Sequence, residues 1–201
     1  ALGLDPEAVD LFNRLAPPDG PHLLGTDELG RDLLLRLLYG GRVSLAVGLL
    51  GALGASLVGL LVGLGAGFAG GRADALLMRL TDMLLAFPVF FLLLTVTTLF
   101  GRTIPVLILV LGLTSWGVNA RIVRGQVLSI KEKEFVEAAR SLGATNRGIV
   151  WRHIFPNILP PIVVELTVRV GYAIFTVATL SFLGVGIQPP SPDWGLQVAE
   201  E

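Results

Sequence analysis

The sequence predicts an all-α, polytopic membrane protein, and three observations lead to that prediction. Hydrophobic residues make up 53% of the 201 residues and charged residues only 15%, with a mean hydropathy of +0.74, which is more apolar than a soluble domain. Four uncharged stretches of about 18 residues or more are each long enough to cross about 30 Å of hydrocarbon as a helix. Since none of them alternates polar with apolar residues, helices are favoured over a transmembrane barrel.

These stretches place a membrane domain at 43–201 after an external segment at 1–42. The predicted spans lie at about 43–68, 83–101, 103–120 and 165–187. In the external segment, LGTDELGRDLLLRLLYGGR carries leucine at Leu29, Leu33 and Leu37, which predicts a short helix lying in the membrane interface or packed on the rest of the protein. The chain begins in a polar segment without Met, so we expect a piece of a longer protein.

Basic residues are distributed unevenly between the two sides that four spans create. One side holds nine of them: Arg72, Arg79, Arg121, Arg124, Lys131, Lys133, Arg140, Arg147 and Arg152. The other side holds five, diluted by acidic residues: Arg14, Arg31, Arg36, Arg42 and Arg102. The positive-inside rule therefore places the loop at 121–157 in the cytoplasm and both chain ends outside. A formal net charge of −1 argues against the basic surface of a nucleic-acid-binding protein, so no nucleic-acid partner is expected.

The first two predicted spans carry packing signals. Small residues recur every fourth position in the first span: Gly51, Ala55, Gly59, Gly63 and Gly67. This spacing lets another helix approach closely, either from the same chain or from a partner subunit. In the second span Pro88 removes one backbone hydrogen bond and predicts a kink.

Ionisable residues near the spans are candidates for ion or substrate contact. Asp82 precedes the second span and is interpreted as an interfacial residue or as an ion site. Glu165 and Arg169 are expected to neutralise each other near the cytoplasmic edge, or to contact substrate. An ion-coupled secondary carrier that uses these three residues is the alternative from another functional class. His22 and His153 fall on opposite sides and cannot form a zinc pair, and the sequence has no phosphate-binding loop, so neither a metal site nor catalysis is expected.

The densest charge lies in the cytoplasmic stretch KEKEFVEAARSLGATNRGIVWRHIFPN. Ser129 and Glu132 match a capping box, which predicts that a helix begins there, and Gly143 predicts its end. Thr145 predicts the cap of a second helix that ends at Pro156. The sequence therefore predicts a pair of short helices between two membrane spans.

One face of the first short helix is predicted to be apolar, because Phe135, Ala138, Ala139 and Leu142 follow helical spacing. This face could lie on the bilayer, yet half of it is alanine, and membrane-lying helices usually bury larger side chains. The loop could merely connect two spans, but it has more structure than a connection requires. A groove on a cytoplasmic partner explains the pattern best, because alanine permits close approach while charges fix the orientation.

EFVEAARSLGA followed by RHIFPN resembles the EAA loop of permease subunits of bacterial ABC importers, specifically the dipeptide/oligopeptide type. The resemblance extends through LGTDELGRDLLLRLLYGGRVSL and SFLGVGIQPPSPDWG and covers nearly the whole chain from about Leu24. The general EAA pattern has Ile and Leu where this sequence has His153 and Phe155, although its RHI-x-PN form resembles the peptide branch.

This resemblance implies a type I ABC importer permease bundle in the bacterial inner membrane, of which the chain would hold four of the usual six transmembrane helices. It implies a coupling helix that docks on an ATPase subunit through these residues: Glu137, Ala138, Ala139, Arg140, Gly143 and Pro156. The implied partners are ABC ATPase subunits, a second homologous permease subunit, an extracytoplasmic substrate-binding protein and the lipid bilayer. No cofactor is expected in this chain, because ATP and Mg would be bound by the ATPase. The implied cargo is a di- or oligopeptide, with nickel or another small solute as the alternative.

Overall fold

The computed structural model describes residues 5–187 and 191–200, where the regular structure is helical apart from one isolated bridge between Thr26 and Asp32. The α-helices are α1 (Leu33–Ala69), α2 (Gly71–Ala86), α3 (Val89–Phe100), α4 (Ile104–Lys131), α5 (Glu134–Ser141), α6 (Asn146–Ile149), α7 (Phe155–Phe182) and α8 (Trp194–Glu200). A 3-10 turn, Leu11–Asn13, precedes them, and a π-helical turn, Val150–Ile154, joins α6 to α7. The all-α prediction is confirmed. Within the block SFLGVGIQPPSPDWG, residues 188–190 lie outside the described residues.

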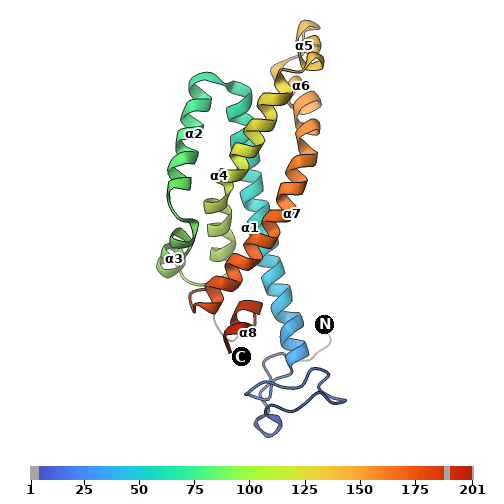
Figure 1. Cartoon of the computed structure of the whole chain (residues 1–201), viewed down its shortest axis with the longest axis vertical. Coiled ribbons are helices and arrows are strands. Elements are labelled where there is room, and N and C mark those ends of the chain that lie inside the picture. Colours follow the sequence, from blue (N-terminus) through green and yellow to red (C-terminus); the bar gives the residue numbers. More distant parts are fainter. Residues whose placement is uncertain (1–4, 188–190, 201) are drawn as a thin grey trace.

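Three continuous helical stretches among the described residues are long and apolar enough to cross a membrane: Leu33–Ala69, Ile104–Lys131 and Asn146–Phe182. A fourth crossing results if α2 and α3 count as one broken span. The chain ascends in α1, descends through α2 and α3, ascends in α4 and descends in α7 (Figure 1). The end that carries α5 and α6 also carries most basic residues, so we call it the cytoplasmic end and its opposite the external end.

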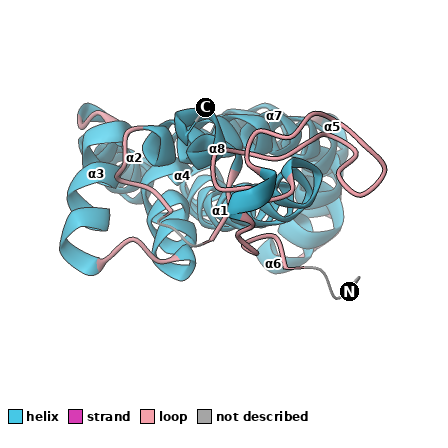
Figure 2. Ribbon diagram, turned by 90° about the horizontal axis from the view of Figure 1, so that it is seen from below, coloured by secondary structure: helices cyan, strands magenta, loops and turns pink. Residues whose placement is uncertain are grey.

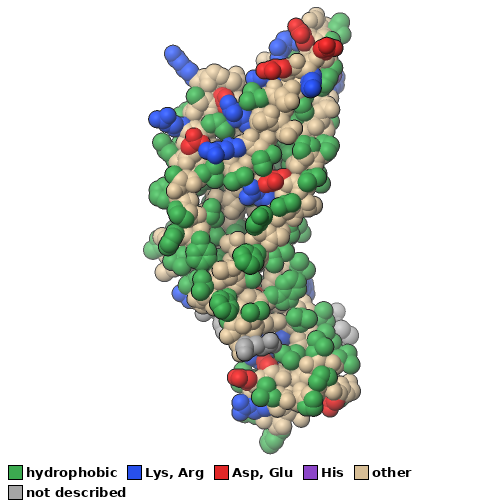
Figure 3. Space-filling view, in the orientation of Figure 1, with side chains coloured by type: hydrophobic (Ala, Val, Ile, Leu, Met, Phe, Trp, Pro, Cys, Tyr) green, Lys and Arg blue, Asp and Glu red, His purple; other side chains and the backbone are tan. Residues whose placement is uncertain are grey.

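Charged side chains gather at these two ends (Figure 3). Between them lies a largely apolar girdle, which is interrupted by a small group of acidic and basic side chains. Seen along the bundle from the external end, α2 and α3 stand to one side of the group formed by α1, α4 and α7 (Figure 2). This arrangement is that of a membrane bundle with polar ends.

The second crossing is broken where the sequence predicted a kink. The axes of α2 and α3 differ by 79°, and the break falls at Phe87 and Pro88, both of which have extended backbone. A residue before proline is driven away from helical angles, and proline has no N–H to donate. The predicted kink at Pro88 is therefore confirmed, and it divides the predicted span at 83–101 between the end of α2 and α3.

The separate interfacial helix expected within 1–42 is not formed. Gly25 and Gly30 adopt φ of +80° and +75°, and the chain just before α1 folds into a turn that the bridge between Thr26 and Asp32 closes. Asp32 then caps α1, because its carboxylate accepts a hydrogen bond from Leu35 N at 2.9 Å. From there α1 continues without interruption to Ala69, so the leucines from Leu33 onward belong to the first membrane helix.

The small-residue repeat of α1 packs against α4 of the same chain. A Cβ added at Gly63 would lie 2.7 Å from Val123 Cβ, and one added at Gly67 would lie 2.9 Å from Val127 Cβ. Both glycines are buried. Of the two partners that the sequence left open for this stripe, the structure shows the intrachain one.

Two apolar cores lie along the bundle. The external core contains Val47, Leu93, Leu107, Val110, Leu111, Val177, Leu180 and Ile187. The cytoplasmic core contains Val123, Val127, Val136, Ile149, Ile154 and Ile158. Asn119 of α4 and Arg169 of α7 lie between the two cores along their helices and hydrogen-bond to each other, with 2.7 Å from Arg169 Nε to Asn119 Oδ1. A polar layer therefore separates the cores in the middle of the membrane domain.

At the external end, a partly buried ion-pair cluster ties the N-terminal segment to α1 and α8. Asp27 accepts hydrogen bonds from Arg31 Nε at 2.6 Å and from Arg36, and Arg36 also donates to Glu200 at 2.6 Å. Burial would raise the pKa of Asp27, but hydrogen bonds from Arg31, Leu29 and Arg36 outweigh it and hold the pKa below its ordinary value. The cluster is thus built around an ionised carboxylate.

Candidate docking site

The first short cytoplasmic helix begins later than the sequence predicted. Ser129 lies inside α4, which continues to Lys131, so the capping-box prediction is wrong. The preceding residues are already helical, and extending an existing helix is easier than starting a new one at Ser129. Instead α5 begins at Glu134, after Lys133, whose side chain makes no capping hydrogen bond. Its end is as predicted, since Gly143 adopts φ of +83°.

The helix α5 is held to the bundle by one side of its surface. Val136 is fully buried and belongs to the cytoplasmic core together with Ile149 of α6. Phe135 is 45% exposed and Leu142 is 89% exposed, and Ala138 is also exposed. Three of the four positions on the face that the sequence predicted to be apolar are therefore exposed, and α5 itself lies at the tip of the molecule (Figure 1).

Five of the six predicted docking residues lie on α5 or directly after it. Glu137, Ala138, Arg140 and Gly143 are exposed, and Ala139 is half-buried. The sixth residue, Pro156, is exposed but lies at the start of α7. These six docking roles stay predictions, because the chain is alone in the structure.

The second short helix is capped as predicted, but it does not end at Pro156. Thr145 Oγ1 accepts a hydrogen bond from Gly148 N at 3.2 Å. Beyond α6, Phe155 N donates to Val150 O five residues back, which shifts the hydrogen-bond register just before Pro156. Since proline has no N–H, this π-helical turn lets the chain pass through Pro156 into α7. One continuous helical rod, Asn146–Phe182, therefore connects the tip to the membrane domain.

Three contacts that sequence reasoning missed tie the tip to the rest of the chain. The rings of Phe135 and His153 lie 6.4 Å apart, which brings α5 against the π-helical turn. Lys131 donates to Gly67 O at 2.9 Å and fixes the end of α4 to the end of α1. Arg124 binds both carboxylate oxygens of Asp74, with 2.5 and 2.7 Å between donor and acceptor, and so joins α4 to α2. Residue spacing alone carries no signal for such contacts between distant segments.

Of the three membrane ionisable candidates, the structure brings only two together. Asp82 pairs with Arg121, and both side chains are more than half exposed. Glu165 and Arg169 pair as predicted, with 2.8 Å from Arg169 Nη2 to Glu165 Oε1. The pair lies in the middle of α7 and not near the cytoplasmic edge, because α7 begins at Phe155, almost three turns upstream of residue 165, where the predicted span began.

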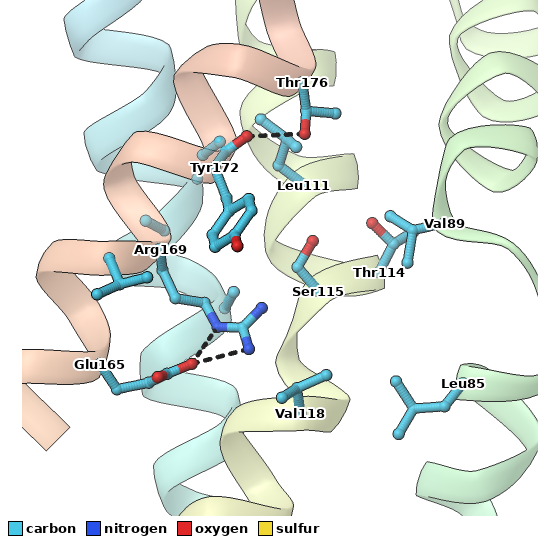
Figure 4. Close-up of a pocket in the computed structure, with 15 residues that line it drawn as sticks. Leu85, Val89, Leu111, Thr114, Ser115, Val118, Glu165, Arg169, Tyr172 and Thr176 are labelled. Atoms are coloured by element: carbon cyan, nitrogen blue, oxygen red, sulfur yellow. Dashed lines mark hydrogen bonds and ion pairs between the residues drawn. The ribbon is translucent and has the colours of Figure 1, made fainter. Parts of the chain in front are cut away.

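The Glu165–Arg169 pair faces a cavity of about 380 Å³ between α7, α4, α1 and the α2–α3 break (Figure 4). Its polar lining includes Ser115 and Tyr172, and its walls are otherwise small or aliphatic. Paired charges in the middle of a membrane helix are tolerated when they face a protein interior or a water-filled cavity. The middle of the bundle is therefore a second candidate site.

The family described as binding-protein-dependent transport system inner membrane component matches residues 55–201. The chain is 41% identical over 196 residues to the dipeptide transport system permease protein DppC of Bacillus subtilis, covering 96% of the chain and 61% of that relative. It is 43% identical over 182 residues to the oligopeptide transport system permease protein OppC of Haemophilus influenzae, covering 90% and 58%.

A third relative, the glutathione transport system permease protein GsiD of Pectobacterium atrosepticum, is 42% identical over 183 residues, covering 91% of the chain and 61% of the relative. The chain thus spans about three fifths of the length of these relatives. The family match covers most of the chain and includes both the tip and the membrane helices. The chain belongs to the family of binding-protein-dependent transport system inner membrane components, which are multi-pass proteins of the bacterial inner membrane.

Proposed function

We propose that the chain is part of a permease subunit of an ATP-driven importer for di- and oligopeptides, and that a separate ATPase moves it through α5. The observation that carries this proposal is the outward-facing surface of α5, where Leu142 is 89% exposed although the helix itself is anchored by a buried Val136. An apolar surface on a rigidly held helix suits a groove in another protein. The names of the relatives support peptides as the cargo.

The proposed mechanism is mechanical. The rod that runs from α6 through the π-helical turn into α7 connects the tip to the membrane domain, so a displacement of α5 by a partner would tilt α7 against α1 and α4. ATP and Mg belong to the ATPase partner, and this chain contributes no catalytic group. The other proposed partners are a second homologous permease subunit and an extracytoplasmic binding protein. Only 11% of the most apolar stretch of Asn146–Phe182 is buried, against 50% for α4, which leaves room for the second subunit.

The proposal is tested with the full-length protein, assembled with its partner subunits in proteoliposomes. Glu137→Lys reverses the charge on the exposed face, and Gly143→Val places a branched residue at φ of +83°, which strains the end of α5. Both variants should weaken ATPase binding and uncouple ATP hydrolysis from uptake. Unchanged peptide uptake in both would refute the coupling role.

The cargo is tested in the same vesicles, by supplying dipeptides, longer peptides and nickel complexes separately. ATP-dependent uptake of peptides supports the proposal, whereas uptake of nickel alone identifies the other type of cargo. Peptide uptake driven by an ion gradient without ATP would select the ion-coupled carrier.

A further inference from the structure

We propose that Glu165 and Arg169 form a transit site for the charged termini of the peptide, with Arg169 contacting the carboxylate and Glu165 the ammonium group. This inference rests on the proposed function, because it names a contact that the imported peptide makes inside the membrane domain. Its starting point is the cavity of about 380 Å³ in Figure 4, which lies at the level of the polar layer between the two apolar cores.

The pair leaves hydrogen-bonding capacity of both signs unused. Glu165 Oε1 accepts from both Arg169 Nε at 2.9 Å and Arg169 Nη2 at 2.8 Å, and Nε also donates to Asn119. Among the residues that the structure describes, Arg169 Nη1 and Glu165 Oε2 have no partner. Figure 4 shows the remaining guanidinium nitrogen turned away from Glu165 toward Ser115. A cationic donor and an anionic acceptor are therefore available within one site.

Position and surroundings favour a ligand over simple neutralisation. The side chains of Arg169 and Glu165 are 18% and 26% exposed, so both reach the cavity and neither is sealed in the core. Asn119 holds the guanidinium from α4 and is held in turn by Ser56 of α1, with 3.1 Å from Asn119 Nδ2 to Ser56 Oγ. Groups on three helices thus fix one arginine in an orientation that leaves its outer nitrogen toward the cavity.

The geometry fits a short zwitterion. In the closed pair Glu165 Oε1 and Arg169 Nη2 are 2.8 Å apart, but the backbones of the two residues are about 6 Å apart along the helix, so the charged groups can separate toward that spacing when a ligand opens the pair. The two termini of an extended dipeptide are about 7 Å apart. Apart from this pair, the described residues that line the cavity carry no charge, and many are aliphatic, such as Leu85, Val118 and Val168, so the strongest contacts on offer are those to the charged termini. The site therefore recognises what all short peptides share.

Binding at this site would also be weak enough for transport. In the empty site the two charges neutralise each other, and a bound zwitterion replaces that one ion pair by two new ones. The net gain is small, because the existing ion pair is broken and the charged termini of the peptide lose their hydration. Passage through a membrane pathway requires contacts that let the substrate both enter and leave.

The test uses the full-length permease in its assembled complex, with a saturating amount of peptide-loaded binding protein. Arg169→Gln and the double variant Glu165→Gln/Arg169→Gln are compared with wild type for dipeptide uptake and ATP hydrolysis. Each single change leaves an unpaired charge, but the double variant removes both charges at nearly constant volume. If the pair only neutralises itself, the double variant restores uptake; if it contacts peptide, uptake stays about tenfold below wild type while the complex assembles and hydrolyses ATP.

A second readout identifies the contacted group. Wild type should import a dipeptide with a free carboxylate faster than its C-terminal amide, after correction for the separately measured affinity of the binding protein. Arg169→Gln should bring this ratio close to one. The matched control is Asp82→Asn/Arg121→Gln, which removes an exposed ion pair that does not line the cavity and should leave uptake within about twofold of wild type.

The outcomes separate this inference from the proposed function. If wild type imports peptides with ATP but the double variant does so equally well, the transit site is refuted and the permease function stands. An unchanged preference for the free carboxylate in Arg169→Gln likewise refutes it. If wild type imports no peptide with ATP, the proposed function fails and the transit site fails with it.

Discussion

The contact between α1 and α4 and the exposed face of α5 both use small side chains, but only the first is covered within the chain. In the membrane, Gly51, Gly59, Gly63 and Gly67 are buried against α4. At the cytoplasmic tip, Ala138 and Leu142 face solvent. Small side chains thus line a helix contact inside the membrane domain, whereas at the tip they lie beside the bulkier Phe135 and Leu142 on an exposed surface. The comparison shows that a stripe of small residues predicts a close helix contact. Its position in the molecule indicates whether the helix that covers it belongs to the same chain.

The largest expected effect comes from a substitution that disrupts the contact between α1 and α4. A Cβ at Gly63 would meet the backbone carbonyl of Ala120 and would lie 2.7 Å from Val123 Cβ, so α1 and α4 must move apart. We expect Gly63→Ala to lower the free energy of unfolding by about 1–3 kcal/mol, measured by thermal or denaturant unfolding in detergent. Gly65→Ala is the control in the same helix, because nothing lies within 4 Å of its added Cβ. Equal stabilities of the two variants would contradict the packing account.

A smaller effect distinguishes the side of α5 that packs on the bundle from the side that is exposed. Val136→Ala removes a fully buried side chain and should destabilise the tip by about 1–2 kcal/mol. Leu142→Ala removes a side chain that is 89% exposed and should change stability by less than about 0.5 kcal/mol. Amide hydrogen exchange at 131–155 measures both. Faster exchange in the Leu142 variant would show that this face is packed, and the tip would then offer no free surface.

The smallest effect concerns pH. It compares the contact between α1 and α4 with the ion-pair cluster around Asp27, whose stability depends on charge. Since the pKa of Asp27 is lowered in the fold, its ion pairs stabilise the external end at pH values above the ordinary carboxyl pKa of about 3.9. That contribution is lost as the pH falls through the lowered value. Limited proteolysis of the segment 5–32 should therefore accelerate in acid below that range, and Asp27→Asn should be cleaved faster already at neutral pH. The contact between α1 and α4 has no such group, so its stability should not follow the same pH profile.

Much of the fold could be predicted, because its strongest signals are local. Uncharged length revealed the membrane helices, and Gly143 and Thr145 marked helix ends through their own backbone or side chain. The failures occurred where a longer element overrode a local signal. Ser129 is a good helix cap, but α4 already includes it, and Pro156 is a good helix breaker, but the π-helical turn accommodates it.

The two candidate sites, the outer face of α5 and the Glu165–Arg169 pair, also differ in how far the sequence could predict them. The outer face of α5 follows from helical spacing, so the exposed positions Glu137 and Ala138 could be predicted from the sequence. That Arg169 lies in mid-membrane could not be predicted, because it depends on where α7 begins. Its contact with Asn119 joins residues that are 50 positions apart, and one sequence carries no record of such pairs.

The central claim is that the outer face of α5 is gripped by a separate ATPase on the cytoplasmic side. The 201 residues contain no cysteine, so a thiol introduced into this part of the protein has no native thiol beside it in the sequence. Ala138→Cys in the full-length complex, with a matched cysteine in the docking cleft of the ATPase subunit, should form a disulfide cross-link under mild oxidation. Phe12→Cys, which replaces a side chain that is 99% exposed on the external segment, should form none and should be labelled only from outside the cell. Labelling of the Ala138 variant from outside, or no cross-link to the ATPase in an assembled and active complex, would contradict the account.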